Sequence, residues 1–242
     1  MIVVRSAVFN VLIVILTLGM AFLCLPLLLA PPSAVRRAAG IWARAVIRLL
    51  RWVCGVTVEV RGLHHIPQGG VVIAAKHQSA FDTAVWLTLV PDAVYVLKKE
   101  LLSIPLYGWL ARRAGMIPVD RSAGAAALRG MLRAAVAAVG AGQQIVIFPE
   151  GTRTAPGERV PYQPGVVAIA AATGAPVVPV ATDSGRVWGR RAFHKHPGVI
   201  RVSVLPALPP GLGRAALLSR LEAEIEDETA RLLAEPVDKS VD

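Results

Sequence analysis

The sequence predicts an α/β protein with a mixed central sheet flanked by helices, preceded by an apolar N-terminal segment. Short β-branched runs alternate with longer helical patterns after residue 55, as is typical of layered α/β folds. Residues 6–35 contain no charged side chain, whereas the rest of the chain is an ordinary globular mixture. A chain of 242 residues is long enough for one substantial domain plus an appendage. We therefore divide it into residues 1–54, a membrane-anchoring segment, and residues 55–242, the main domain.

Residues 8–30 form an apolar run. A membrane-spanning helix needs about 20 apolar residues, so this run is long enough to cross a bilayer. It exceeds the roughly 7–15 apolar residues of a cleaved signal peptide, and two prolines follow where cleavage would be expected. We therefore expect the segment to be retained. Gly19 and Pro26 also allow a kinked helix that enters only one leaflet.

Residues 35–53 predict an amphipathic helix. Its arginines fall on one side of a helical wheel (Arg37, Arg44, Arg48 and Arg51), and its large apolar residues fall on the other (Trp42, Val46, Leu49 and Val53). Such a helix can lie in a membrane interface with its arginines at the level of the phosphates. An ordinary amphipathic helix docked on the domain would show the same pattern. The arginines follow the apolar run, which places the main domain on the cytoplasmic side.

The main domain contains alternating strand and helix patterns. Strands are predicted at 57–60, 71–75, 94–97, 116–119, 145–148, 177–181 and 199–204, and helices at 79–89, 98–114, 123–139, 166–173 and 217–233. A Pro-Gln-Gly-Gly turn joins the first two strands. We interpret the acidic face of the last helix, from Glu222 to Glu228, as a solvated surface.

The net charge is +10, from 26 Lys and Arg against 16 Asp and Glu. Such a field attracts nucleic acid, anionic lipid or anionic cofactors. Aromatic residues make up only 5%, and no nucleic-acid-binding signature is present, so an anionic membrane surface with phosphorylated substrates is the favoured partner. The two cysteines lack metal-ligand spacing, and His194 and His196 lack a third ligand, so no metal site is predicted.

His77 and Asp82 form the first candidate catalytic pair. His77 follows the strand predicted at 71–75, and open α/β sheets gather their sites at the carboxyl ends of strands. Asp82 lies one turn into the next helix, where its carboxylate can fix the imidazole tautomer and leave the other nitrogen to take a hydroxyl proton. Ser79 and Asp82 also match a capping box, which would give Asp82 a structural role. The two roles are compatible.

Two later turns carry arginines that can bind an anion. Arg121 follows a short strand, and Arg153 ends the segment Phe-Pro-Glu-Gly-Thr-Arg. Two guanidinium groups that converge on one pocket can hold a phosphate monoester. Alternatively, Asp120–Arg121 and Glu150–Arg153 are local ion pairs. No Gly-x-Ser-x-Gly elbow is present, so a serine-nucleophile lipase is not expected.

Four motifs resemble, in their order, those of the 1-acylglycerol-3-phosphate O-acyltransferase family. They are His77-x4-Asp82, Gly-Met-Ile-Pro-Val-Asp-Arg at 115–121, Phe-Pro-Glu-Gly-Thr-Arg at 148–153 and Val-Pro-Val at 178–180. The resemblance extends from about residue 56 to residue 188, and the third motif is the most specific. Lys76 stands where many members have asparagine.

The resemblance implies an enzyme of phospholipid biosynthesis that acylates lysophosphatidate to phosphatidate. It implies a glycerolipid acyltransferase-like fold, acyl-CoA or acyl carrier protein as donor, no cofactor, and a place at the cytoplasmic face of the inner membrane. It also implies that His77 and Asp82 are catalytic. The residues implied to bind the acceptor are Arg121, Gly151, Thr152 and Arg153. Glu150 is implied either to contact the glycerol part or to order the arginines. Apart from the resemblance, basic pairs at 98–99 and 112–113 can steer either donor, or they form an ordinary solvated face; the sequence does not separate the two.

Three other functions fit parts of the same pattern. The acceptor can be another lysolipid, such as a lyso-ornithine lipid, with unchanged chemistry. Water can replace the lipid hydroxyl, which would make the protein a thioesterase. A membrane-bound lipid carrier is the non-catalytic alternative, but lipid binding alone needs no general base, so His77 and Asp82 argue against it.

Overall fold

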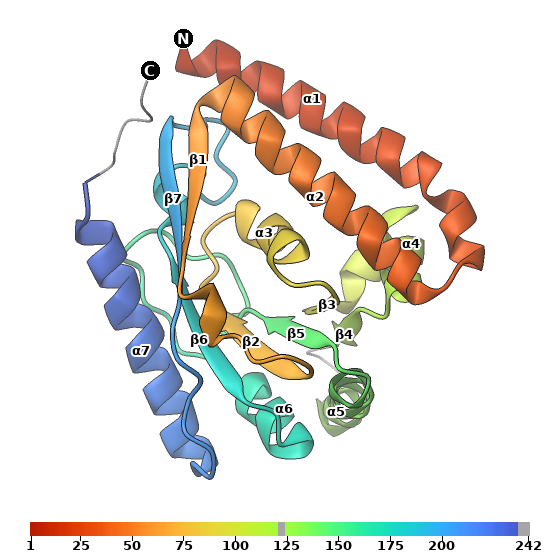
Figure 1. The fold of residues 1–242 in the computed structure, drawn as a ribbon, viewed down its shortest axis with the longest axis vertical. Helices are drawn as coiled ribbons and strands as arrows, with labels where there is room; N and C mark the ends of the chain where they lie inside the picture. The colour runs from red at the N-terminus through yellow and green to blue at the C-terminus, as the bar shows by residue number, and fades with distance from the viewer. Residues whose placement is uncertain (121–123, 237–242) are drawn as a thin grey trace.

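A computed structural model describes residues 1–120 and 124–236. Its seven strands are β1 Val56–Arg61, β2 Val71–Ala75, β3 Ala93–Lys98, β4 Ile117–Val119, β5 Gln144–Ile147, β6 Val177–Thr182 and β7 Gly198–Val204. They form one sheet in the order β1-β7-β6-β2-β5-β3-β4 (Figure 1). Neighbouring strands are parallel except β6 and β7, which pair antiparallel. The predicted mixed sheet is therefore confirmed.

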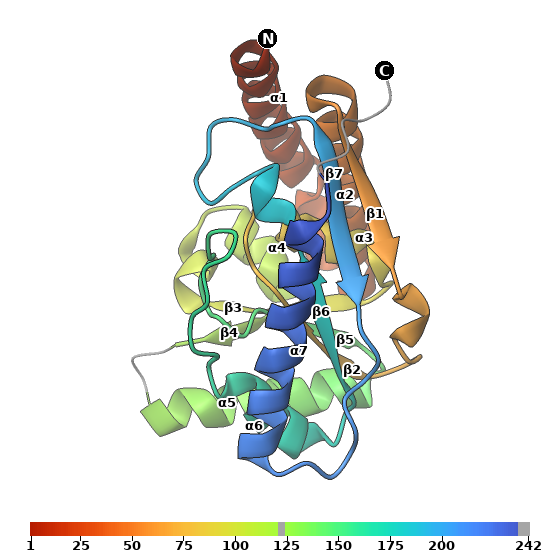
Figure 2. The same cartoon turned by 90° about the vertical axis from the view of Figure 1, so that its left-hand side faces the viewer.

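Helices cover both faces of the sheet (Figures 1 and 2). One layer contains α1 Ile2–Leu23, α2 Pro32–Cys54 and α3 Phe81–Leu89, with α4 Tyr107–Ala114 beside α2; the other contains α5 Gly124–Gly140, α6 Gly165–Thr173 and α7 Arg214–Ala234. The side chains of β2 alternate between the two layers. Ile73 belongs to the apolar core with Leu50 of α2, whereas Val72 belongs to the core with Ile225 of α7.

Two features of the main domain differ from the sequence prediction. The helix predicted at 98–114 is a 3-10 turn, Lys99–Ser103, followed by α4 alone. Pro105 interrupts the helix, and Leu106 takes a positive φ of 63° just before α4 begins. The strands on either side of the Pro-Gln-Gly-Gly turn, β1 and β2, are not neighbours, because β7 and β6 lie between them.

The N-terminal segment is an antiparallel helical hairpin, with α1 and α2 joined by a short 3-10 helix, Leu25–Leu29. Pro26 lies in that joint, so α1 ends at Leu23 instead of continuing to residue 30. The Trp42 indole N–H of α2 donates to the Thr17 hydroxyl of α1 at 3.1 Å. Among the described helices, α1 alone is long and apolar enough to cross a membrane.

The hairpin also packs on the main domain. Phe9 of α1 and Val46 of α2 are buried in the same core as the sheet. The arginine face predicted for α2 is confirmed as solvent-exposed (Arg37, Arg44, Arg48 and Arg51). The division at residues 54 and 55 stays a prediction, and the first 54 residues contribute directly to the core.

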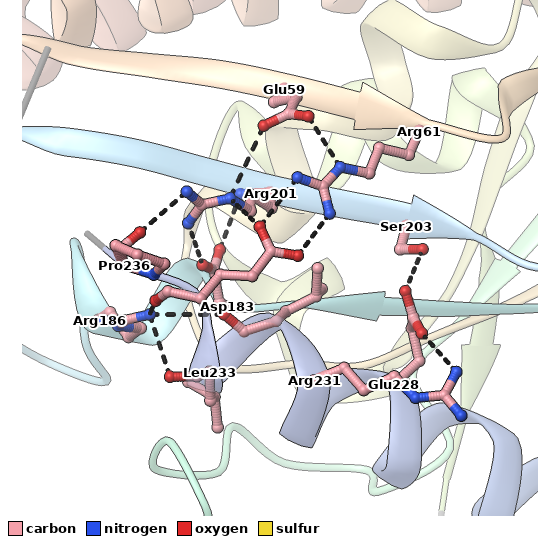
Figure 3. Close-up of polar contacts among 12 residues, drawn as sticks. Glu59, Arg61, Asp183, Arg186, Arg201, Ser203, Glu228, Arg231, Leu233 and Pro236 are labelled. Atoms are coloured by element: carbon pink, nitrogen blue, oxygen red, sulfur yellow. Dashed lines mark hydrogen bonds and ion pairs between the residues drawn. The ribbon is translucent and has the colours of Figure 1, made fainter. Parts of the chain in front are cut away.

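A cluster of charged side chains fastens the C-terminal end of α7 to the sheet (Figure 3). Arg201 of β7 is 2% exposed, and its guanidinium lies 3.3 Å from Asp183 Oδ2 and 2.9 Å from Glu235 Oε2. Arg61 of β1 binds the same Glu235 carboxylate through two N–H groups, at 2.6 and 2.9 Å. Arg186 donates to the main-chain carbonyls of Leu232, Leu233 and Glu235 at the end of α7. We call Glu59, Arg61, Asp183, Arg186, Arg201 and Glu235 the sheet-edge cluster.

Candidate active site

His77 lies directly beyond the carboxyl end of β2, before α3 begins. Its backbone N–H donates to Glu150 Oε2 at 2.9 Å, and its carbonyl accepts from the Thr154 N–H at 2.8 Å. The imidazole stacks on the Phe148 ring, with 4.0 Å between centroids and 15° between planes. These contacts hold His77 from both sides while its side chain lines a cavity.

Asp82 orients the imidazole from the first turn of α3. Its Oδ2 lies 3.1 Å from His77 Nδ1 and accepts the backbone N–H groups of Gln78 and Ser79 at 2.7 Å each. A carboxylate at Nδ1 requires that nitrogen to carry the proton, so Nε2 keeps the lone pair of a base. Asp82 therefore combines the two roles that its position in the sequence suggests.

Glu150 follows β5, and its side chain has no exposed surface. One oxygen, Oε2, accepts the His77 N–H, while Oε1 lies 3.0 Å from Lys76 Nζ and accepts the Thr154 hydroxyl at 3.2 Å. Burial raises the pKa of Glu150 to about 7 even though Lys76 favours the ionised form. Both oxygens contact the protein, so the geometry favours a role in positioning His77 over either role that the resemblance implies.

Lys76 pairs with a second carboxylate, which comes from the C-terminal helix. Its Nζ lies 2.5 Å from Glu226 Oε1 of α7, and the two side chains are 1% and 4% exposed. The Tyr162 hydroxyl donates to the same oxygen at 2.9 Å. The prediction of a solvated acidic face is therefore wrong at Glu226, because that side of α7 packs against the domain. We call Lys76, Glu150, Tyr162 and Glu226 the Lys76 cluster.

A cavity of about 860 Å³ opens beside His77. Its walls come from α1 to α5 and from β3 and β5, and its lining is mainly apolar: Met20, Val35, Leu87, Leu97, Leu110 and Met131 are among the side chains that form it. A cavity of this size and character can bury a hydrocarbon chain. His77 then stands where the reacting end of such a chain can be positioned.

Gly151, Thr152 and Arg153 line the same cavity. Gly151 has a φ of 69°, a backbone conformation that favours glycine. Within residues 1–120 and 124–236 no carboxylate lies within 4.0 Å of the Arg153 guanidinium, and Glu150 pairs with Lys76 instead. Arg153 is thus available to an anion. Arg121 falls outside the described residues, and its role stays a prediction.

Two cavity-lining arginines, Arg190 and Arg191, were not predicted from the sequence. Both are exposed on the connection between β6 and β7, and Arg191 has a φ of 56°, which is uncommon for a residue with a side chain. The buried Lys195 fastens this connection to α1, with its Nζ 2.6 Å from Asn10 Oδ1. An adjacent pair of basic residues was the only signal in the sequence, and nothing in its spacing linked it to His77.

The described residues contain no group of three or more His, Cys, Asp or Glu side chains placed to hold a metal ion. His194 and His196 lie on the β6–β7 connection with 6.3 Å between their ring centroids, and both are exposed. Together they do not provide the ligand set of a zinc site.

The fold and the His77–Asp82 pair define a class of acyl-transferring enzymes, and comparison with known families supports this. The family model described as Acyltransferase matches residues 57–183, which include every predicted site residue. The chain therefore belongs to the acyltransferase family. Glu226 and the rest of α7 lie beyond the matched residues.

Individual relatives carry a more specific name. A protein of Pseudomonas aeruginosa named 1-acyl-sn-glycerol-3-phosphate acyltransferase is 35% identical, over 79% of this chain and 76% of the relative. A protein of Limnanthes alba with the same name is 31% identical, over 81% and 70% of the two chains. The crystal structure of PlsC from Thermotoga maritima, an LPA acyltransferase, matches with a TM-score of 0.76 over 97% of this chain and 100% of that one. Its identity is 22%, so this likeness supports the fold.

Proposed function

We propose that this enzyme transfers a fatty acyl group from a thioester donor to the sn-2 hydroxyl of lysophosphatidate and so forms phosphatidate. The observation that carries the proposal is the His77–Asp82 pair beside a large apolar cavity that Arg153 also lines. The relatives from Pseudomonas aeruginosa and Limnanthes alba, both named for this acceptor, support the same substrate.

The reaction is direct transfer between two bound substrates. His77 Nε2 removes the proton of the acceptor hydroxyl, and Asp82 stabilises the imidazolium that forms. The hydroxyl oxygen attacks the thioester carbonyl, the carbon–sulfur bond breaks, and the proton passes from His77 to the departing thiolate. A positioned base contributes about 10²–10⁴-fold, so orientation of the two substrates supplies much of the remaining acceleration.

The phosphate of the acceptor is bound by arginine side chains. Arg153 lines the cavity without an ion-pair partner among the described carboxylates, and a guanidinium can bind a phosphate through two parallel hydrogen bonds. Arg121 is the second predicted ligand. Gly151 allows the main chain to approach the acceptor closely, and the Thr152 hydroxyl can donate a further hydrogen bond.

The donor is acyl-CoA or acyl carrier protein, and both carry phosphate groups. Of the basic residues predicted to steer it, Lys98 lines the cavity, whereas Lys99 pairs with Asp120 at 3.2 Å and Arg113 donates to the Ala30 carbonyl. Arg190 and Arg191 line the cavity as well and are the better candidates for the donor phosphates.

The α1–α2 hairpin holds the enzyme at the cytoplasmic face of the inner membrane. The apolar α1 is compatible with a membrane location. Because α1 runs beside α2, which exposes four arginines, the pair suits insertion into one leaflet with the arginines at the anionic lipid phosphates better than a crossing of the bilayer. Acceptor and product can then stay partitioned in the membrane next to the cavity.

The test is acyl transfer in membranes that contain wild-type protein or His77→Ala, with labelled acyl-CoA and either lysophosphatidate, lyso-ornithine lipid or no acceptor. We expect phosphatidate from the wild type and a loss of about 10²–10⁴-fold in the variant. Phosphatidate formation by His77→Ala at the wild-type rate would reject the assigned base.

Other outcomes identify the alternatives. Transfer only to lyso-ornithine lipid would keep the chemistry and change the acceptor. Thioester loss that is independent of acceptor would indicate hydrolysis. No turnover with acyl-CoA or with acyl carrier protein as donor would favour a lipid-binding protein.

A further inference from the structure

The Lys76 cluster joins the C-terminal helix to the catalytic histidine through three consecutive contacts. Glu226 Oε1 lies 2.5 Å from Lys76 Nζ, which lies 3.0 Å from Glu150 Oε1. The other oxygen of Glu150 accepts the His77 N–H at 2.9 Å. Every side chain in this series is at most 4% exposed, so solvent screens the contacts little. Glu226 thus reaches the backbone of His77 from 149 positions further along the chain.

The charges of this cluster are unequal, since one ammonium group faces two carboxylates. Among the described residues, Arg159 is a further cation near the cluster, but its Nε lies 4.0 Å from Glu226 Oε2 and its side chain is 59% exposed. Tyr162 supplies one hydroxyl hydrogen bond to Glu226. Lys76 is therefore shared between Glu150 and Glu226, and a change at one carboxylate alters how strongly Lys76 holds the other.

We propose that Glu226 is a positioning residue for His77, acting through Lys76 on the carboxylate of Glu150 that holds the His77 backbone. This assignment rests on the proposed function, because it takes His77 as the base. It also explains why a lysine occupies position 76, where many members of the family have asparagine: Lys76 is the cation between Glu150 and Glu226. A neutral residue there would leave the two buried carboxylates facing each other without a cation, so Lys76 and Glu226 should tolerate replacement together better than Lys76 alone.

The first test is a double-mutant cycle on kcat with the variants K76N, E226Q and K76N/E226Q. We expect kcat at pH 7.5 to fall about 100-fold in K76N, which leaves two buried carboxylates without a cation. It should fall about 10-fold in E226Q, where Lys76 is drawn to Glu150 alone and shifts the carboxylate that holds the His77 backbone. The double variant should stay within about 3-fold of E226Q instead of showing the product of the two losses. Asp227→Asn, which neutralises an exposed carboxylate at the next position of α7, is the matched control and should keep wild-type kcat.

The pH dependence of kcat separates positioning from packing. The ionisable and charged groups around Glu150 and its partner Glu226 are Lys76, His77, Arg159 and Tyr162; they come from the segment after β2, the segment before α6 and, for Glu226 itself, α7. Lys76 lowers the pKa of Glu150 and Glu226 raises it. The acid limb of kcat should therefore move to higher pH in K76N and to lower pH in E226Q, whereas a packing defect would reduce kcat equally at every pH.

A measurement without substrate keeps this proposal separate from the proposed function. Hydrogen–deuterium exchange of the amides in residues 76–82 should be faster in E226Q than in Asp227→Asn, because Lys76, no longer shared with Glu226, draws the Glu150 carboxylate away from the His77 N–H. Unchanged exchange together with strictly multiplicative losses of kcat would overturn the role of Glu226. Faster exchange in E226Q, with phosphatidate formation unaffected by His77→Ala, would keep the coupling and reject the base.

Discussion

Two charge clusters fasten α7 to the sheet, and they differ in exposure, charge balance and neighbours. Arg61 and Glu235 of the sheet-edge cluster are 39% and 32% exposed, whereas the charged side chains of the Lys76 cluster are at most 4% exposed. The sheet-edge cluster sets three arginines against three carboxylates, and its contacts join β1, β7 and the end of α7 (Figure 3). The Lys76 cluster sets one lysine against two carboxylates, and one of these holds the backbone of His77. Both anchor the same helix, at its end and at its middle.

The two clusters should contribute to different properties of the enzyme. A balanced cluster at the edge of a sheet is satisfied internally, so its loss should be felt mainly as a loss of stability. In an unbalanced cluster next to a catalytic residue, the protonation state of the carboxylates affects that residue. Loss of such a cluster should therefore lower mainly kcat. Its unequal charges and its contact with the backbone of His77 distinguish the Lys76 cluster.

The largest effect on stability is expected from Arg201→Met. The change removes the guanidinium that pairs with the buried Asp183, which should lower the free energy of unfolding by about 3–5 kcal/mol. Chemical denaturation in detergent micelles measures this, with Arg220→Met, at an exposed helical ion pair, as the control. The kcat of the folded fraction should stay at the wild-type value, and a drop of 10-fold or more would remove the distinction between the clusters.

The next effect is expected from Glu150→Gln, and it should appear in turnover. A glutamine can still accept the His77 N–H, but it exchanges a hydrogen bond to a charged acceptor for a weaker neutral one, so kcat should fall about 10- to 100-fold. The free energy of unfolding at pH 7.5 should not fall, because a neutral glutamine avoids the cost of burying the Glu150 charge. Glu158→Gln, an exposed residue of the same loop, controls for the substitution itself. If Glu150→Gln lowers the free energy of unfolding but leaves the kcat of the folded protein unchanged, Glu150 has a structural role and does not position His77.

A smaller effect is expected in the pH dependence of stability. Burial raises the pKa of Glu150 from 4.5 to about 7, so the folded state binds this proton more tightly than the unfolded state. The contribution of Glu150 to the free energy of unfolding should therefore fall as the pH rises from about 4.5 to about 7, and then level off. Denaturation at pH 5 and pH 8 should show this fall in the wild type and less of it in Glu150→Gln. An equal fall in both proteins would assign it to other groups.

The smallest effect is expected from Glu235→Ala, at the outer side of the sheet-edge cluster. Hydrogen bonds from Arg61 lower the pKa of Glu235, so its contribution to stability is present at neutral pH and is lost as the pH falls through that lowered pKa. The thermal unfolding midpoint of this variant should drop less than that of Arg201→Met, and the difference from wild type should vanish in acid. A larger drop than in Arg201→Met would make Glu235 the central residue of the cluster.

Most helices and strands could be predicted because their signals are local. The runs around β2, β5 and β7 are β-branched and short, and the alanine-rich pattern of α5 has a helical period. The single helix predicted at 98–114 was wrong because Pro105 interrupts it, so that only α4 forms after the proline. The order of strands has no local signal, since it depends on which distant segments share a core.

In the candidate site, too, some contacts follow from local sequence signals and others depend on tertiary packing. His77 and Asp82 are five positions apart across a strand-to-helix connection, so their contact follows from local geometry. The resemblance to the acyltransferase family grouped Gly151, Thr152 and Arg153 with them, and these residues line the same cavity because the parallel strands β2 and β5 end at a common edge. No local sequence signal predicts the buried partners of Lys76. The same is true of the approach of Arg190 and Arg191 to the cavity.

The amino-acid order was enough to establish an α/β domain, an apolar N-terminal helix, a histidine oriented by an aspartate, and motifs that resemble an acyltransferase family. Folding in three dimensions was needed to pair α1 with α2, to enclose the cavity between them and the sheet, and to bring Glu226 to Lys76 across 150 residues. The physical reason is range. Periodicity and turn chemistry act over a few residues, whereas the partner of a buried charge is set by the packing of elements that are remote in the chain.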